Sequence, residues 1–173
     1  MVKFGIIADT HFTSKDEIFR IRNLINQLKK AFKDVDEIIH VGDVCNSSFL
    51  HELEKIAPTK CVRGNEDNFD NLPDFIKFSV SKYNIGVIHK PPKDIEAFFK
   101  ENNLHILITG HTHQPMIKGT PYNKLIINPG SPTQPKAPPQ KKGFDSPIAR
   151  PSVITLSIDK DGILTTFLIN LNI

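Results

Sequence analysis

The stretch VKFGIIADTH, residues 2–11, decides how the rest of the chain is interpreted. Residues 2–8 form a short and mostly apolar run of a length that suits a buried strand. Two side chains that can bind a metal, those of Asp9 and His11, come directly after this run. The same pattern, an apolar strand that ends in polar residues, recurs along the chain.

Four more expected strands end in residues of the same kind. They cover residues 37–41, 59–63, 85–88 and 106–109, and they lead to Asp43, Asn65, His89 and the pair His111 and His113. Glycines at positions 42, 64 and 110 precede three of these groups, and a missing Cβ lets the backbone approach a ligand closely. Because ligands bind beyond the carboxyl ends of strands in open α/β sheets, we expect all these side chains to share one cleft.

The segments between and after these strands predict the remaining elements. Ser14 and Glu17 form a capping-box pattern, and the apolar residues that follow recur with helical spacing up to Phe32. Two shorter helices are expected at residues 48–57 and 94–102, a hairpin at 75–88, and further strands at 125–128, 153–158 and 164–170. This order predicts an α/β fold, a two-sheet sandwich flanked by helices, that forms a single domain over residues 1–173.

Residues 129–151 differ from the rest of the chain. They contain seven prolines, two glycines and four basic residues, without helical or strand periodicity. This composition predicts a long Pro/Lys-rich loop that contributes little to any core, so that most of it is dispensable for folding. The sequence does not distinguish three roles for this loop: a lid over the cleft, a tail-like loop or a surface that binds a partner.

Composition sets limits on the function. The 173 residues are 39% hydrophobic and 24% charged, with a net charge of +3 and no long run of like charges. We therefore expect a cytoplasmic protein with no membrane segment and no dedicated nucleic-acid surface. Cys45 and Cys61 are expected to be reduced thiols, since their spacing matches neither a metal motif nor a disulfide framework. The sequence is compatible with a homo-oligomer and does not determine the oligomeric state.

Each polar motif is weak evidence when taken alone. A single D-x-H or G-D is a common accident of composition or a turn, whereas His111 and His113 after a glycine are more typical of metal sites. The other three histidines, His40, His51 and His105, are interpreted as structural residues. Only the joint occurrence of the motifs, each at the end of a strand, makes a metal site the favoured hypothesis.

The ordered set D-x-H, G-D, G-N-x-D, H and G-H-T-H resembles the calcineurin-like metallophosphoesterases. The segment Asn128-Pro129-Gly130-Ser131 and the chain length are similar to the small, stand-alone phosphodiesterase branch of that family. The same branch includes a retromer subunit. The resemblance therefore implies two alternatives, a metal-dependent phosphodiesterase and a metal-binding or non-catalytic protein-interaction scaffold.

The resemblance implies two metal ions, held by residues that match the family motifs. One would be bound by Asp9, His11, Asp43 and His113, and the other by Asp43, Asn65, His89 and His111. Asp43 would bridge them, and a water between the metals would attack phosphorus. Mixed carboxylate, amide and imidazole ligands suit Mn²⁺, with Ni²⁺, Fe²⁺ or Zn²⁺ as alternatives. Asn65 and His111 are also expected close to the phosphoryl oxygens, as catalytic groups.

Three positions concern the substrate, a small phosphate ester. Many relatives carry a histidine where this chain has Glu66, and a glycine where it has Lys90. A carboxylate is a poor proton donor near pH 7 and repels a dianionic monoester, so Glu66 favours diesters with good leaving groups. Glu66 and Arg63, which lies just before Gly64-Asn65, are the expected substrate contacts, with a solvated side chain as the alternative for each. Lys90 is either a solvated charge or a phosphate contact.

A scaffold would tolerate the loss of metal ligands. All the ligand positions that the family motifs define are filled here by residues able to bind a metal. An enzyme that hydrolyses phosphodiesters is accordingly the favoured function. A nuclease would need a basic groove or a capping domain, for which a chain of this length leaves little room.

Overall fold

The computed structural model describes residues 1–12, 18–68 and 70–173. The elements over these residues, in chain order, are β1 (Val2–Ile7), α1 (Ile18–Ala31), β2 (Glu37–His40), α2 (Ser47–Glu54), β3 (Thr59–Cys61), β4 (Phe75–Val80), β5 (Tyr83–Ile88), α3 (Ile95–Glu101), β6 (Ile106–Thr109), β7 (Pro115–Gly119), β8 (Leu125–Pro129), β9 (Ser152–Ile158) and β10 (Leu164–Asn170). Beta-alpha alternation in the first part gives way to mostly strands in the second, as the sequence predicts.

The strands form two five-stranded mixed sheets. The first has the order β10-β9-β1-β2-β3, in which β1, β2 and β3 run parallel. The second has the order β4-β5-β6-β8-β7, in which β5, β6 and β8 run parallel and β4 and β7 are antiparallel edges. Parallel strands end at a common edge, so each sheet gathers the residues that follow its central strands.

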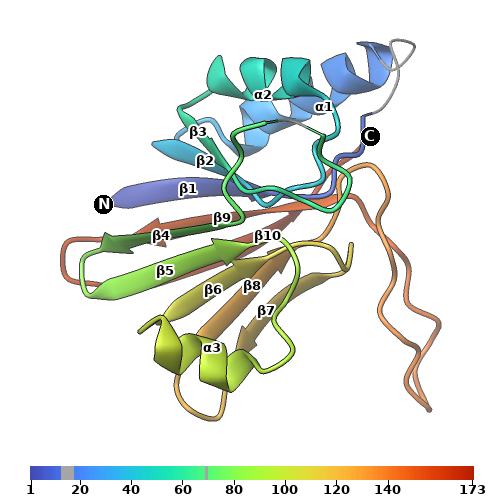
Figure 1. Ribbon diagram of the computed structural model, residues 1–173. Helices are drawn as coiled ribbons and strands as arrows, with labels where there is room; N and C mark the ends of the chain where they lie inside the picture. Colours follow the sequence, from blue (N-terminus) through green and yellow to red (C-terminus); the bar gives the residue numbers. More distant parts are fainter. Residues whose placement is uncertain (13–17, 69) are drawn as a thin grey trace.

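The sheets pack face to face and the helices cover their outer faces (Figure 1). In β1, Phe4 and Ile6 point into the core between the sheets, whereas Ile7 points to α1 and α2, as the two-residue period of a strand requires. Phe99 of α3 packs on the outer face of the second sheet. The predicted two-sheet sandwich flanked by helices is confirmed.

The Ser14–Glu17 capping box lies outside the described residues, although the helix predicted after it is present as α1. Strand β7 was not predicted at all. Four of its five residues are exposed, because it is an edge strand paired only with β8, and an exposed strand shows no apolar alternation to detect.

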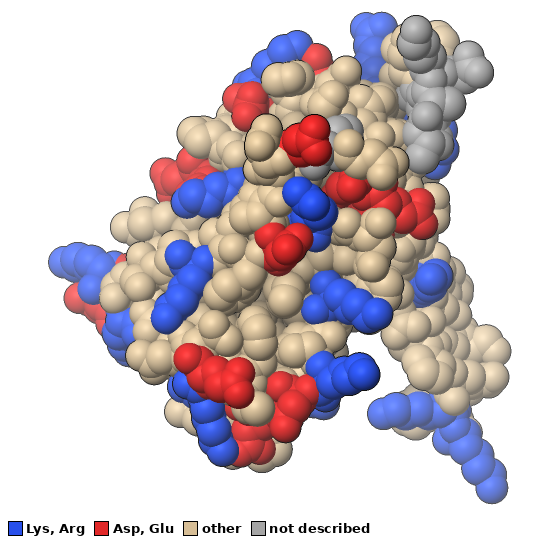
Figure 2. Space-filling view, in the orientation of Figure 1, with Lys and Arg blue, Asp and Glu red and all other residues tan. Residues whose placement is uncertain are grey.

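The Pro/Lys-rich loop contains no helix or strand between residues 130 and 151. Its base is closed by a hydrogen bond in which the Ser152 hydroxyl donates to the Pro129 carbonyl at 2.7 Å. From there the loop projects away from the sheets (Figure 1), and basic side chains lie at its far end (Figure 2). Elsewhere on the face in Figure 2, acidic and basic side chains are interspersed. None of the described helices is long and apolar enough to cross a bilayer.

Candidate metal centre

The polar residues that follow β1, β2, β5 and β6 meet at the ends of both sheets. Backbone hydrogen bonds connect these strand ends: the Asp9 amide donates to the Gly42 carbonyl at 3.0 Å, and the Gly110 amide donates to the His89 carbonyl at 2.9 Å. The Asp9 carboxylate accepts the His111 amide at 3.0 Å, which connects the first sheet to the second. Residues distant in sequence are thereby held around one point.

Asp9, His11 and His113 form a first cluster of potential ligands. The Nε2 atoms of His11 and His113 are 3.2 Å apart, and Asp9 Oδ1 lies 3.6 Å from His113 Nε2. His113 Nδ1 donates to the Gln134 carbonyl at 2.7 Å, which leaves a lone pair on Nε2 in the neutral ring. Imidazole nitrogens and a carboxylate oxygen therefore converge on one small space, as they do around a metal ion.

A second cluster consists of Asp43, His89 and His111. His89 Nε2 lies 3.2 Å from Asp43 Oδ2, and His89 Nδ1 donates to the Val41 carbonyl at 2.7 Å. Asp43 Oδ2 is also 3.7 Å from His11 Nε2 of the first cluster. Asp43 thus belongs to the second cluster and also lies close to the first.

The backbone is strained where it carries these side chains. Six of the ten non-glycine residues with positive φ in the described part of the chain are Asp9, His11, Asp43, Cys45, His111 and His113, with φ from 46° to 68°. Such conformations cost about 1–2 kcal/mol per residue in L-amino acids. Strained residues persist only where the surrounding structure holds them in place, and they cluster at functional sites. The concentration of strain here therefore indicates a functional site.

Two glycines permit the close approach of these loops. Gly42 has a φ of +88°, and a Cβ there would lie 2.8 Å from His89 Nδ1. A Cβ on Gly64 would overlap the backbone nitrogen and the carboxylate of Asp43. The space beside Asp43 therefore exists only because position 64 has no side chain.

Asp67 supports the same region, although no role was predicted for it from the sequence. Its buried carboxylate accepts four backbone N–H groups at 2.8–2.9 Å, those of Asp43, Val44, Cys45 and Gly64. The signal was present in the sequence, since Asp67 is the last residue of the G-N-x-D motif. Its function is to hold the loop of Asp43 against the loop of Gly64.

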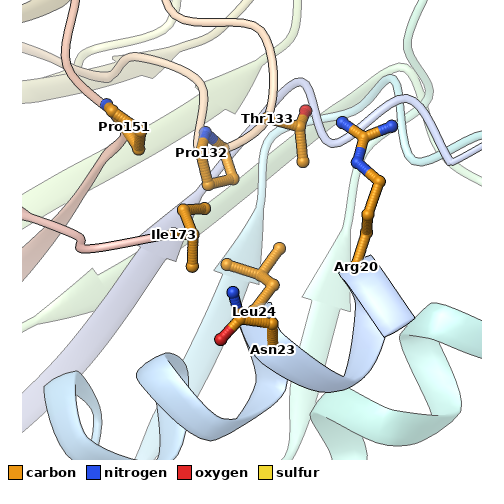
Figure 3. Close-up of a pocket in the computed structure, with 7 residues that line it drawn as sticks. All are labelled: Arg20, Asn23, Leu24, Pro132, Thr133, Pro151 and Ile173. Carbon is orange, nitrogen blue, oxygen red and sulfur yellow. The ribbon is translucent and has the colours of Figure 1, made fainter. Parts of the chain in front are cut away.

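The first residues of the Pro/Lys-rich loop also support the centre. The hydroxyls of Ser131 and Thr133 donate to the Asp9 carbonyl at 2.7 and 3.3 Å, and Thr133 also donates to the Thr10 carbonyl at 2.9 Å. On its other side, Thr133 lines a cavity of about 240 Å³ between α1, the loop and Ile173 (Figure 3). This part of the loop is therefore packed between the helix and the metal centre.

A cleft of about 390 Å³ opens onto the clusters. It is lined by His11, Asp43, Asn65, Glu66, His111, His113, Gln134 and Lys136. Glu66 stands at its rim, with a 65% exposed side chain whose Oε2 is 3.8 Å from His11 Nδ1. Lys136, which no sequence pattern singled out, is brought there by a hydrogen bond from its amide to the His113 carbonyl. Arg63 lines a neighbouring pocket instead.

This arrangement agrees with the comparison to known proteins. The sequence model of the calcineurin-like phosphoesterase superfamily domain matches residues 2–146. The chain belongs to this superfamily. A probable metallophosphoesterase of Methanothermobacter thermautotrophicus is 32% identical over 163 residues, which cover 90% of this chain and 85% of the relative.

Solved structures share the fold of this superfamily member over its whole length. A single mutant of Vps29 from Entamoeba histolytica superimposes with a TM-score of 0.69 at 23% identity, covering 99% of this chain and 100% of Vps29. A protein described as a novel archaeal phosphodiesterase gives a TM-score of 0.68 at 22% identity, covering 97% of this chain and 100% of that protein. These likenesses establish the fold.

The residues of this calcineurin-like centre fit divalent metal ions. His89 Nε2 is buried and has no hydrogen-bond partner in the described part of the chain, although it faces a carboxylate at 3.2 Å. A buried nitrogen left without a partner is costly unless a cation or proton occupies the space before it. The Nε2 atoms of His11 and His113 face each other at 3.2 Å in the neighbouring cluster. The superfamily's use of divalent metals is thus consistent with this donor set.

Burial and mutual charge set the ionisation of the side chains in this centre. Burial raises the pKa of Asp9 to about 7. Burial also acts to raise the pKa of Asp43, but the facing His89 ring, the hydrogen bond from the Glu66 amide and nearby histidine charge lower it to about 2. Burial alone would lower the pKa of His89, yet the close Asp43 carboxylate, the hydrogen bond to the Val41 carbonyl and the charge of Asp9 raise it.

Two further residues lie behind the ligands. His40, interpreted from the sequence as structural, is fully buried, and burial lowers its pKa to about 3. Its neutral ring accepts the Gly42 amide at 3.2 Å and lies 3.1 Å from the Thr10 hydroxyl. Cys45 Sγ lies 3.8 Å from His11 Nδ1, and burial raises the pKa of its thiol to about 12. A protonated thiol is a poor ligand, in keeping with the sequence-based interpretation.

Proposed function

We propose that this chain is a binuclear metal-dependent phosphodiesterase. One observation carries the proposal: two clusters of carboxylate and imidazole ligands lie side by side, and Asp43 lies within reach of both. Paired divalent ions at such a centre are suited to in-line displacement at phosphorus. Every ligand position that the superfamily resemblance defines is filled, which favours an enzyme over a scaffold.

The residues fit two ions with a shared carboxylate. Asp9, His11 and His113 would hold one ion and Asn65, His89 and His111 the other, with Asp43 between them. The mixture of carboxylate, amide and imidazole favours Mn²⁺, with Ni²⁺, Fe²⁺ or Zn²⁺ as alternatives. When bound, such ions lower the pKa of water and polarise phosphoryl oxygens.

The protein's own side chains orient the centre and the ester. Backbone carbonyls of Val41 and Gln134 fix the rings of His89 and His113, so their Nε2 atoms keep one direction. Asn65 and His111 line the open cleft, where they can contact the phosphoryl oxygens. These two residues therefore serve substrate as well as metal in this proposal.

Glu66 favours diesters over monoesters in this site. Its side chain lines the cleft, so its negative charge faces an incoming phosphate ester. A monoanionic diester is repelled less than a dianionic monoester. A carboxylate also assists a leaving group poorly, which favours esters of acidic alcohols such as phenols. The shared fold with the archaeal phosphodiesterase supports the same substrate class.

The test uses metal-free protein reconstituted separately with Mn²⁺, Ni²⁺, Zn²⁺ or Mg²⁺. We expect two metal equivalents per chain, and faster hydrolysis of bis(p-nitrophenyl) phosphate than of p-nitrophenyl phosphate. Asp43→Asn should lower kcat on the order of 10³-fold, as loss of a catalytic electrostatic group does. Asp34→Asn, at an exposed position, is the matched control. Full activity with one metal would contradict the binuclear centre, and metal binding without any esterase activity would favour the scaffold.

A further inference from the structure

We propose that the pocket beside the metal centre, which carries Arg63 and Lys90, binds a second phosphoryl group of the substrate. This inference rests on the proposed phosphodiesterase function and adds a substrate class to it. The preferred substrate is then a diester in which one ester arm carries a further phosphate. The sequence left both residues open between solvated charges and phosphate contacts, and their shared position in the fold favours the second.

The pocket adjoins the metal centre directly. It has a volume of about 220 Å³ and is lined by Arg63, Gly64, Asn65, Asp74, Ile88, His89 and Lys90. Asn65 and His89 also belong to the candidate ligand set, so the pocket shares a wall with the centre. A substrate whose scissile phosphorus lies at the metals would place one arm next to this pocket.

Two strands from different sheets bring the cations together. Arg63 follows β3 in the first sheet, where its amide donates to the Pro73 carbonyl at 2.8 Å. Lys90 follows β5 in the second sheet, directly after His89. Both side chains are exposed and lie outside the sandwich core. Core packing therefore does not explain why two cationic residues line the same pocket.

The charge of the pocket favours an anion. Arg63 Nε is 3.9 Å from Asp74 Oδ1, and that carboxylate is 88% exposed, so the contact is long and well solvated. Within the described residues, no ion pair involves Lys90. One carboxylate therefore stands against two cations. A guanidinium and an ammonium at one site are typical of phosphate recognition.

The shape and lining argue against other occupants. Apart from His89, the described residues that line the pocket offer no aromatic ring on which a base could stack, and Ile88 is the one large apolar residue among them. A single phosphoryl group is small enough for this volume. The pocket therefore selects for charge on the substrate arm and not for the identity of a base.

The test compares two substrates that differ in one phosphoryl group. They are thymidine 5′-(p-nitrophenyl phosphate) and the same compound with a 3′-phosphate, which share the scissile bond and the leaving group. With metal-loaded protein, we expect the 3′-phosphate to lower KM about tenfold, the effect of roughly one charge-assisted contact, with kcat little changed. The double variant Arg63→Met/Lys90→Met should lose this preference while it still hydrolyses the simpler diester.

Lys77→Met is the matched control, because Lys77 is an exposed lysine on β4 and lines none of these pockets. It should keep the full preference. Arg63 and Lys90 are exposed, so each single variant should also fold and lose part of the preference. Equal KM values for the two substrates in the parent, or an unchanged preference in the double variant, would overturn the inference and leave the phosphodiesterase proposal standing.

A binding measurement separates the two proposals completely. Calorimetry should give a lower Kd for thymidine 3′,5′-bisphosphate than for thymidine 5′-monophosphate in the parent, and similar values in the double variant. If neither chromogenic diester is hydrolysed, the phosphodiesterase proposal fails. The two Kd values then decide the inference alone, and equal values in the parent would refute it.

Discussion

At the scale of single residues, Asp67 determines how the loop of Asp43 is held. Replacing its carboxylate in Asp67→Asn exchanges one acceptor oxygen for an NH₂ group that cannot accept the backbone amides now bound to it. Unsatisfied buried groups cost about 1–3 kcal/mol each, so we expect a loss of several kcal/mol in the free energy of unfolding. Urea denaturation measures the effect, and exposed Asp34→Asn is the control. A loss below about 1 kcal/mol would show that the amides find other partners.

The space beside Asp43 leaves no room for a side chain at position 64. Gly64→Ala places a methyl group where the Asp43 backbone and carboxylate now lie, so the loops must separate. We expect a loss of about 1–3 kcal/mol of stability, as in overpacked cores, together with weaker metal binding. Gly119→Ala in β7 is a close control, because a Cβ there meets nothing within 4 Å. Thermal unfolding and metal titration of both variants test this, and similar behaviour of the two would argue against a close approach at Gly64.

At the scale of elements, the Pro/Lys-rich loop divides into two parts. Residues 131–137 are tied to the centre: His113 Nδ1 donates to the Gln134 carbonyl, and Gln114 Nε2 donates to the Ala137 carbonyl at 3.1 Å. Residues 138–149 are mostly exposed. Replacing residues 138–149 by a short Gly/Ser linker should therefore leave the melting temperature and metal affinity nearly unchanged.

Extending the same replacement to begin at residue 134 should weaken metal binding, since His113 loses the segment that orients its ring. Differential scanning calorimetry and metal titration of the two deletions compare the parts directly. Weaker metal binding after replacement of residues 138–149 alone would contradict this division of the loop, because these residues make no contact with the centre among those described.

At the scale of the whole molecule, the buried charges make stability depend on pH. The folded pKa of Asp9, about 7, lies above its unfolded value of 3.8, so its contribution to stability is present below pH 4 and is lost as pH rises through about 7. The raised pKa of His89 acts in the same direction. Asp43, with a pKa of about 2, stays ionised across this range. Four other histidines act in the opposite direction, because burial lowers their pKa values and the unfolded chain binds the protons that they lack: His40, His105, His111 and His113. The free energy of unfolding of the metal-free parent, taken relative to that of Asp9→Asn, should therefore fall between pH 5 and pH 8.

Metal ions oppose the contributions of Asp9 and His89, because they bind the ionised carboxylate and the neutral imidazole. Mn²⁺ should stabilise the protein more at pH 8 than at pH 6, by about 1.4 kcal/mol per pH unit for each proton released. Urea denaturation of the parent and of Asp9→Asn, with EDTA or with Mn²⁺ at several pH values, measures both effects. A parent that gains stability relative to Asp9→Asn as pH rises, with EDTA present, would contradict the raised pKa of Asp9.

The sequence by itself determined the order of the strands that carry Asp9, Asp43, His89 and His113. Each of these strands is a buried apolar run with a polar end, and that signal is contained in a few adjacent residues. The hairpin of β9 and β10 around Asp161-Gly162 is predicted for the same reason, because the residues of a turn signal are adjacent in the sequence. Resemblance to a family then suggested how the polar residues group around metals, and the fold brings them together in neighbouring clusters.

Only the tertiary structure decided which distant residues share a site. It brought Lys136 into the cleft, gave Asp67 its four amide donors, and placed Arg63 beside Lys90 and away from Glu66. It also revealed β7, an edge strand with no apolar face of its own. These features depend on how two sheets pack and where their loops meet, and contacts of that kind leave no period or spacing in the sequence, because the partners are far apart along the chain.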